Sequence, residues 1–186
     1  KIGYIQNYQV TVLQNIISET KNINNFTINY SNSTIPLLLD VLNSLPKSTK
    51  LLIELKTSKK NKLMVSLFLD MITQYNFIYA VQSFNPSIVY LFKKRAKDII
   101  RGQILKAKPS KYRLVNFLLG TIPFYKIAKP DFINYRFEDL PNKRMDKLKD
   151  KGMTILSYTA KSEKELTFIR SRYDNAVFEN FKPKIL

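Results

Sequence analysis

The 186-residue sequence contains neither cysteine nor histidine. Without cysteine, disulfides and thiolate metal sites are excluded. Without histidine as well, only oxygen ligands remain, and these favour hard cations such as Mg²⁺ or Ca²⁺ over zinc. No apolar run reaches the roughly 18 residues that span a bilayer, and no secretory signal is visible. We therefore expect a cytoplasmic protein or one at a peripheral membrane face.

Glycine and acidic residues are also scarce. The four glycines form no Gly-x-Gly-x-x-Gly or P-loop motif, which weakens the case for a nucleotide-binding open sheet. Only 14 acidic residues oppose 31 basic ones, for a formal net charge of +17. A field of this size attracts nucleic acid, anionic membranes or phosphorylated ligands. Compositional drift that raises surface lysine explains the same charge, and both interpretations stay open.

Short apolar runs separated by amphipathic segments dominate the rest of the chain. They predict six strands, at residues 51–55, 78–82, 99–105, 132–135, 153–158 and 176–178. A further short strand is predicted at residues 4–8, and residues 111–126 are predicted to form a longer, partly helical excursion. Alternating strands and helices indicate a parallel sheet with helical crossovers. The pattern alone does not separate a barrel from an open doubly wound sheet.

Local signals mark where several helices begin and end. Thr34 with Pro36 in the first turn, and later Asn85-Pro86, are typical of helix starts. Pro141 is predicted to open a helix that Gly152 ends. A Ser-x-x-Glu capping box at Ser162 and Glu165 opens the last helix.

The length favours one domain over residues 1–186. It is short for a closed (β/α)8 barrel, which takes about 250 residues. The first residue is Lys1 rather than methionine. Three alternatives explain both this start and the short length: a truncated chain, a processed product or an incomplete copy.

Polar signatures follow five of the predicted strands. They read Ile53-Glu54-Leu55-Lys56, Gln82-Ser83-Phe84-Asn85-Pro86, Arg101-Gly102, Ser157-Tyr158-Thr159 and Asp174-Asn175-Ala176-Val177-Phe178-Glu179. The carboxyl ends of strands are where barrel enzymes hold their sites. Glu54 and Lys56 alternate along one strand, so both side chains should point to the same face. They form either a simple ion pair or part of a site.

The order and spacing of these signatures resemble the C-terminal three-quarters of a glycerophosphodiester phosphodiesterase, over roughly residues 35–181. The resemblance implies an α/β fold of the TIM-barrel type that is incomplete, with about six of eight strand–helix units. It also implies hydrolysis of glycerophosphodiesters to glycerol 3-phosphate and an alcohol, with Mg²⁺ or Ca²⁺ as cofactor.

Two positions carry over directly from this resemblance. Glu54 takes the place of a metal ligand, and Lys56 takes the place of a contact to the substrate phosphate. Arg101 corresponds to a second position that could bind phosphate, and a structural salt bridge is the alternative.

The resemblance also assigns a wall to the substrate pocket. Ser83 either hydrogen-bonds near the site or helps to start the following helix, and Phe84 lies next to it as a packing residue. Tyr158 stands where the family usually has a tryptophan beside the substrate glycerol. Glu179 is expected at the barrel mouth.

The catalytic part of the family pattern is missing. The family opens with His-Arg-Gly, continues with a Glu and an Asp for the metal, and has a second histidine in His-Asp. In a loose alignment, Gln9 and Val10 replace that His-Asp pair. General acids and bases contribute roughly 10²–10⁴-fold each, so we expect little or no diesterase activity from this chain. A barrel without its first strands exposes two sheet edges, which a missing segment, a partner chain or remodelling would cover.

Three hypotheses follow for the function. The first is a phosphodiesterase seen without its N-terminal quarter. The second is a non-catalytic module that binds phosphate-bearing lipids or polymers through Lys56, Arg101 and the basic surface. The third is a nucleic-acid binder that uses the clusters Lys59-Lys60, Lys93-Lys94-Arg95 and 106–113, but no known nucleic-acid motif supports it.

Overall fold

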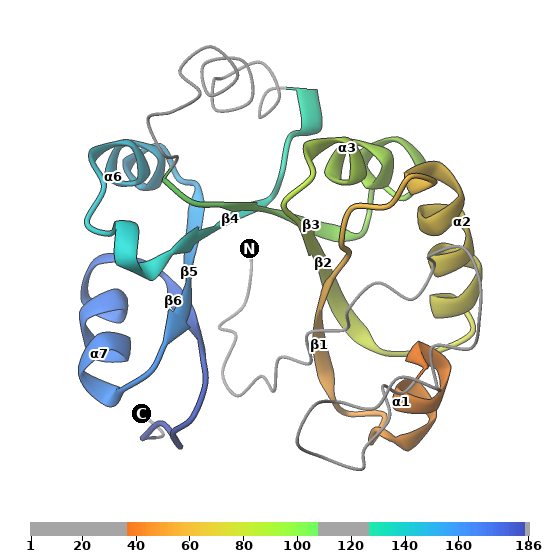
Figure 1. The fold of residues 1–186 in the computed structure, drawn as a ribbon, viewed down its shortest axis with the longest axis horizontal. Helices are drawn as coiled ribbons and strands as arrows, with labels where there is room; N and C mark the ends of the chain where they lie inside the picture. Colours follow the sequence, from red (N-terminus) through yellow and green to blue (C-terminus); the bar gives the residue numbers. More distant parts are fainter. Residues whose placement is uncertain (1–36, 108–126, 185–186) are drawn as a thin grey trace.

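Six parallel strands form one sheet in the computed structural model, which describes residues 37–107 and 127–184 (Figure 1). The strands follow one another in the sheet in chain order, and each pairs in parallel with the next. They are β1 (Lys50–Glu54), β2 (Ile78–Ser83), β3 (Ile100–Leu105), β4 (Phe132–Arg136), β5 (Thr154–Ala160) and β6 (Asn175–Phe178). The predicted strands are thus confirmed within two residues at each end.

The helices all lie on the convex side of the curved sheet (Figure 1). They are α1 (Leu38–Ser44), α2 (Asn61–Ile72), α3 (Pro86–Arg95), α6 (Lys143–Asp150) and α7 (Glu163–Arg172), with the short 3₁₀ helix η3 (Phe137–Asp139) after β4. A doubly wound sheet would reverse its strand order and carry helices on both faces. The sequential order and one-sided helices therefore establish a curled half-barrel, the predicted incomplete (β/α) barrel.

Four predictions fall outside the described residues, and a fifth does so in part. The four are the strand at residues 4–8, the replacement of His-Asp by Gln9 and Val10, the helix start at Thr34 and Pro36, and the excursion at residues 111–126. The fifth is the basic cluster 106–113, of which only residues 106 and 107 are described.

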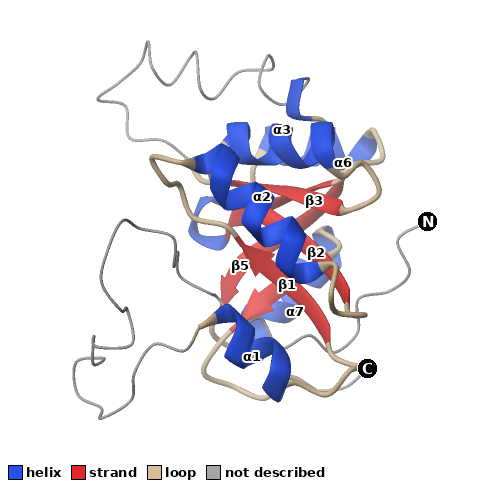
Figure 2. Cartoon of the chain, turned by 90° about the vertical axis from the view of Figure 1, so that its right-hand side faces the viewer, coloured by secondary structure: helices blue, strands red, loops and turns tan. Residues whose placement is uncertain are grey.

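Period-two alternation along the strands builds the core between sheet and helices. On β1, Leu51 and Ile53 point toward the helices together with Leu55, and all are buried. They pack with Phe68 and other buried side chains of α2 and with Leu42 of α1. A second cluster joins β4–β6 to α6 and α7. Figure 2 shows α2 and α3 running over the outside of the sheet, and these two helices contact each other.

Helix ends follow the predicted capping chemistry with one exception. Asn85 Oδ1 accepts a hydrogen bond from the Ser87 N–H at 2.9 Å and caps α3. Ser162 Oγ accepts one from the Glu165 N–H at 3.3 Å and caps α7. Gly152 follows α6 with φ +85°, the left-handed conformation that glycine adopts without strain.

The exception is Pro141, which does not open α6. The helix begins at Lys143 after Asn142, whose side chain accepts hydrogen bonds from the N–H groups of Arg144 and Met145. A side-chain oxygen satisfies the free N–H groups of the first turn, which proline cannot do. The proline therefore lies before the cap. Among residues 37–107 and 127–184, no helix is long and apolar enough to cross a membrane.

Candidate functional site

Glu54 and Lys56 form an ion pair where β1 ends. The ammonium Nζ of Lys56 donates to Oε1 of Glu54 at 2.5 Å. Because Ile53 and Leu55 face the helices, the two charged side chains lie on the opposite, concave face, as the alternation predicted. The Glu54 side chain is 10% exposed and that of Lys56 37%, so the carboxylate lies below an ammonium that reaches solvent.

An aromatic pair continues this group across the sheet. The rings of Phe84 and Tyr158 meet edge to face, with centroids 6.0 Å apart. Lys56 Nζ lies 5.9 Å from the centroid of Phe84, within cation–π distance. Gln103 Nε2 donates to the carbonyl oxygens of Ser83 and Phe84 at 3.0 Å each, which fixes the main chain that carries the Phe84 ring.

The Tyr158 phenol is held by the end of β3. It donates to the carbonyl oxygen of Leu105 at 3.2 Å. Burial raises the pKa of Tyr158, Arg136 opposes the rise, and the negative charges of Asp139 and Glu54 add to it. The phenol therefore stays protonated at neutral pH and presents a neutral aromatic wall.

Ser83 has a structural role that fits the second of its two interpretations. Its buried hydroxyl donates to the Leu55 carbonyl oxygen at 2.6 Å and accepts from the Asn85 N–H at 3.1 Å. Asn85 in turn caps α3. Ser83 thus joins the end of β1 to the start of α3, and it positions the loop that contains Phe84.

Arg101 does not join the group at the strand ends. It pairs in register with Val81, a core residue, and therefore faces the helices. Its guanidinium donates to the carbonyl oxygens of Lys97 and Ile99 at 3.1 and 3.3 Å, and lies 3.5 Å from an Asp131 carboxylate oxygen. The salt-bridge interpretation of this residue is the one that the geometry supports. The adjacent Gly102 is required for packing, because a Cβ there would overlap the ring of Phe132.

Glu179 lies directly after β6, at the carboxyl-end edge of the sheet. Its N–H donates to the Ala160 carbonyl oxygen at 3.0 Å, and its carboxylate lies 3.9 Å from the Lys161 ammonium. The side chain is half exposed. Between Ser157 and Ala160 the pairing of β5 with β6 is irregular, a feature that re-aims side chains near functional sites.

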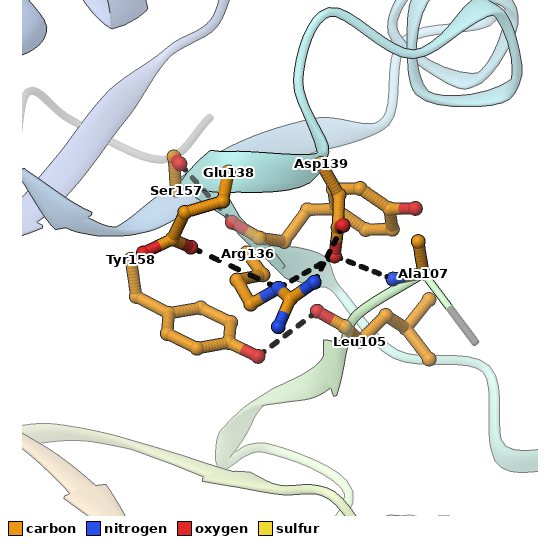
Figure 3. Close-up of polar contacts among 8 residues, drawn as sticks. Leu105, Ala107, Arg136, Glu138, Asp139, Ser157 and Tyr158 are labelled. Atoms are coloured by element: carbon orange, nitrogen blue, oxygen red, sulfur yellow. Dashed lines mark hydrogen bonds and ion pairs between the residues drawn. The ribbon is translucent and has the colours of Figure 1, made fainter. Parts of the chain in front are cut away.

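A charged pair at the end of β4 was not predicted from the sequence (Figure 3). Arg136 Nε and Nη2 donate to the two carboxylate oxygens of Asp139, at 2.7 Å each. Asp139 also accepts from the Ala107 N–H at 2.6 Å. The bidentate bond from Arg136 lowers the pKa of Asp139, so this carboxylate is ionised at neutral pH.

The ion pair of Arg136 and Asp139 lies beside Tyr158, which is part of the aromatic wall. Arg136 is in register with Tyr158 on the neighbouring strand, and Figure 3 shows both side chains near the end of β3. The sequence signal was present, because Arg136-Phe137-Glu138-Asp139 follows an apolar strand as Glu54-Leu55-Lys56 does.

For the divalent cation that the sequence resemblance implies, the described residues supply an incomplete set of ligands. In the described part of the chain, no group of three or more acidic, histidine or cysteine side chains could hold a metal ion. Glu54 is already bonded to Lys56 and Asp139 to Arg136. These residues do not form a cation site by themselves. What the arrangement offers is an ammonium beside a carboxylate, with an apolar aromatic wall, which suits a small anionic ligand that also carries hydroxyl and C–H groups.

Several solved phosphodiesterases share this fold. A phosphodiesterase from Oleispira antarctica, in complex with the product sn-glycerol-3-phosphate, superposes with a TM-score of 0.63 at 19% identity, over 78% of this chain and 57% of that one. A glycerophosphodiester phosphodiesterase from Thermotoga maritima gives 0.56 at 15% identity, over 78% and 60% of the two chains. One from Parabacteroides distasonis gives 0.54 at 18% identity, over 70% and 53%.

These similarities establish the fold as that of glycerophosphodiester phosphodiesterases. The chain spans less than two thirds of the length of each of these proteins. Neither a family model nor a curated protein matches the sequence.

Proposed function

We propose that this chain binds the glycerol phosphate unit of a glycerophosphodiester on the concave side of the half-barrel, at the carboxyl ends of β1, β2 and β5. One observation carries the proposal. Lys56 contacts both the Glu54 carboxylate and the Phe84 ring, and Phe84 in turn contacts Tyr158. A cation, an anion and an apolar wall from three strands thus meet in a fold shared with phosphodiesterases.

Each part of this group has a task in such binding. The Lys56 ammonium is a mobile point charge with three donors, and it offsets a phosphate's charge. When it turns to a phosphate, the Glu54 carboxylate becomes free to accept from a glycerol hydroxyl or to bind a cation. The rings of Phe84 and Tyr158 would lie against the C–H groups of glycerol.

A divalent cation is part of the proposal only through Glu54, which would supply one oxygen ligand. Mg²⁺ and Ca²⁺ take about six or more oxygens, and the described residues around Glu54 do not supply them. The remaining ligands would come from water, from the ligand's phosphate or from residues outside the described ranges.

Hydrolysis is a separate matter from binding. The resemblance implies two histidines as general acid and base, and these 186 residues contain none. We therefore propose binding with little or no turnover for this chain alone. Lipid or glycerol metabolism is the setting that the resemblance implies, either as part of a phosphodiesterase or as a non-catalytic binding module.

Isothermal titration calorimetry with sn-glycerol 3-phosphate, with and without Mg²⁺, tests the proposal. Inorganic phosphate and glycerol are the matched ligands. We expect glycerol 3-phosphate to bind more tightly than either, because only it uses both the ammonium and the aromatic wall. If inorganic phosphate binds as tightly as glycerol 3-phosphate, the aromatic wall adds nothing to binding, and the proposed site is contradicted in favour of general attraction between a basic protein and an anion. Release of choline from glycerophosphocholine above the buffer rate would contradict the absence of turnover.

A further inference from the structure

A groove lies between the first turns of α2 and α3, outside the strand-end site. Its volume is about 580 Å³. The residues of its lining that matter here are Lys59, Lys60, Lys62, Leu63, Ser87 and Tyr90. Asn61 Nδ2 donates to Ser87 Oγ at 3.4 Å and holds the two helix starts together. No acidic side chain lines the groove.

The charge around this groove is strongly one-sided. Residues 58–96 hold six basic residues and a single acidic one, Asp70. Arg95 Nη1 donates to the Lys62 carbonyl oxygen at 3.1 Å, which places a guanidinium beside the groove. Residues 127–184, on the other half of the sheet, hold nine acidic residues against thirteen basic ones, and some of them form ion pairs, as Arg172 does with Asp146 at 2.6 Å. The excess of positive charge per residue is therefore larger around α2 and α3 than on the other half of the sheet.

Apolar side chains are exposed among these cations. Leu63 is 47% exposed, Leu67 42% and Tyr90 39%. Leu63 and Leu67 are four residues apart on α2 and so share one face of the helix. The Lys93 ammonium lies 5.9 Å from the centre of the Tyr90 ring. Exposed leucines beside lysines and a tyrosine match the composition of a membrane-interface surface, in which lysine stems lie along apolar groups while their charges reach the headgroups.

We infer that the α2–α3 face, made of Lys59, Lys60, Lys62, Leu63, Leu67 and Tyr90, binds the surface of an anionic lipid bilayer. The phosphates of a nucleic acid would bind the lysines, but they provide no apolar environment in which exposed leucine side chains could be buried. An anionic bilayer binds both kinds of side chain, because lysines near its charged surface and apolar area buried among its lipids each strengthen binding. This inference does not depend on the ligand proposed for Lys56.

The α2–α3 face and the strand-end site lie at the same end of the half-barrel. Helices α2 and α3 begin just after β1 and β2 end, so the groove lies on the same end of the half-barrel as Glu54 and Phe84. A bilayer that contacts the groove would therefore approach the edge of the sheet where those side chains lie.

Vesicle co-sedimentation of the full chain tests the charge component. Vesicles of phosphatidylcholine alone are compared with equimolar phosphatidylcholine and phosphatidylglycerol. The triple variant Lys59→Gln, Lys60→Gln, Lys62→Gln should bind the anionic vesicles about 100-fold more weakly. Its matched control, Lys143→Gln, Lys147→Gln, Lys151→Gln on and after α6, removes the same charge from exposed positions and should lose only a few-fold. An equal loss in both variants would overturn the inference, because the general field would then suffice.

The apolar component separates a bilayer from a soluble polyanion. The double variant Leu63→Ser, Leu67→Ser should lose about tenfold or more in vesicle binding, while Leu39→Ser, an exposed leucine on α1, should not. Binding of single-stranded DNA should be the same in all three proteins. Leucine variants that bind vesicles like the wild type, with circular dichroism showing them folded, would refute a lipid surface and point to a polyanion partner.

Discussion

The Asp139 carboxylate accepts two hydrogen bonds from the Arg136 guanidinium, one from Nε and one from Nη2, and both N–O distances are 2.7 Å. Because Asp139 also accepts from the Ala107 N–H, this one carboxylate ties the segment after β3 to the end of β4. The arrangement makes the local stability dependent on the charge of Asp139.

We expect Asp139→Asn to lower the free energy of unfolding at pH 7 by about 2 kcal/mol, since it removes charge-assisted hydrogen bonds. The pKa of Asp139 is lowered in the folded protein, mainly by the bond from Arg136. Its stabilisation is therefore fully present above the ordinary aspartate pKa and is lost as the pH falls below about 4. Urea unfolding at several pH values should show the wild type and variant converging in acid.

Glu138→Gln is the matched control for that experiment. Glu138 is adjacent, 58% exposed and 3.8 Å from the same guanidinium. It should change stability by less than about 0.5 kcal/mol. A difference between wild type and Asp139→Asn that stays constant down to pH 3 would show that packing, and not the ionised carboxylate, explains the effect.

The second prediction concerns the proposed phosphate contact. Lys56→Ala should weaken binding of sn-glycerol 3-phosphate by about 10- to 100-fold, because a charge-assisted hydrogen bond is lost. Calorimetry measures the change, and Lys147→Ala, an exposed lysine on α6, controls for net charge. Equal affinity in the Lys56 variant would remove this residue from the site.

The third prediction concerns Glu54 as a cation ligand. Glu54→Gln keeps the shape of the side chain but removes its charge, so any binding of Mg²⁺ or Ca²⁺ at this site should disappear from a calorimetric titration. The exposed Glu138, changed to Gln, should leave the titration as it is. If the Glu54 variant titrates like the wild type, the ligand assignment is wrong.

The fourth prediction concerns the glycine that follows Arg101. Gly102→Ala would push a Cβ into the Phe132 ring, and we expect a loss of about 1–3 kcal/mol in the free energy of unfolding. Adding Phe132→Leu should recover part of that loss, so the double variant is less destabilised than the sum of the two single ones.

Gly152→Ala tests a different cause of glycine preference. Gly152 has φ +85° and open space around it, so an alanine there is strained by its backbone, by about 1 kcal/mol. Phe132→Leu should not recover the stability that Gly152→Ala loses.

The Gly102 prediction is contradicted if the effects of Gly102→Ala and Phe132→Leu on the free energy of unfolding are additive, because the overlap between the two side chains would then be absent.

Much of the fold was predictable because its signals are local. Buried parallel strands appear as apolar runs, and helix starts at Asn85 and Ser162 depend on the side chain of the capping residue. Glu54 and Lys56 were placed on one face by period-two alternation alone. The prediction for Pro141 was wrong because proline fits both the first turn of a helix and the position before a cap, and here it lies before the cap.

What escaped prediction depends on partners far along the chain. The direction in which Arg101 faces follows from its pairing with Val81 and from the distant Asp131. The role of Ser83 depends on the carbonyl group of Leu55, 28 residues away. A polar residue after a strand has the same local pattern whether it supports the backbone or lines a site, so the pattern alone could not decide.

The in-order pairing of the six strands also shapes how the molecule should unfold. Each strand contacts its sequence neighbours, and the buried side chains divide into one cluster around β1, β2 and α1–α3 and another around β4–β6, α6 and α7. Interactions of this nearest-neighbour kind resemble those of a repeat protein, in which cooperativity decays along the chain. Amide hydrogen exchange should therefore distinguish two cooperative units that open at different free energies, with β3 and its Gly102–Phe132 contact as the coupling between them.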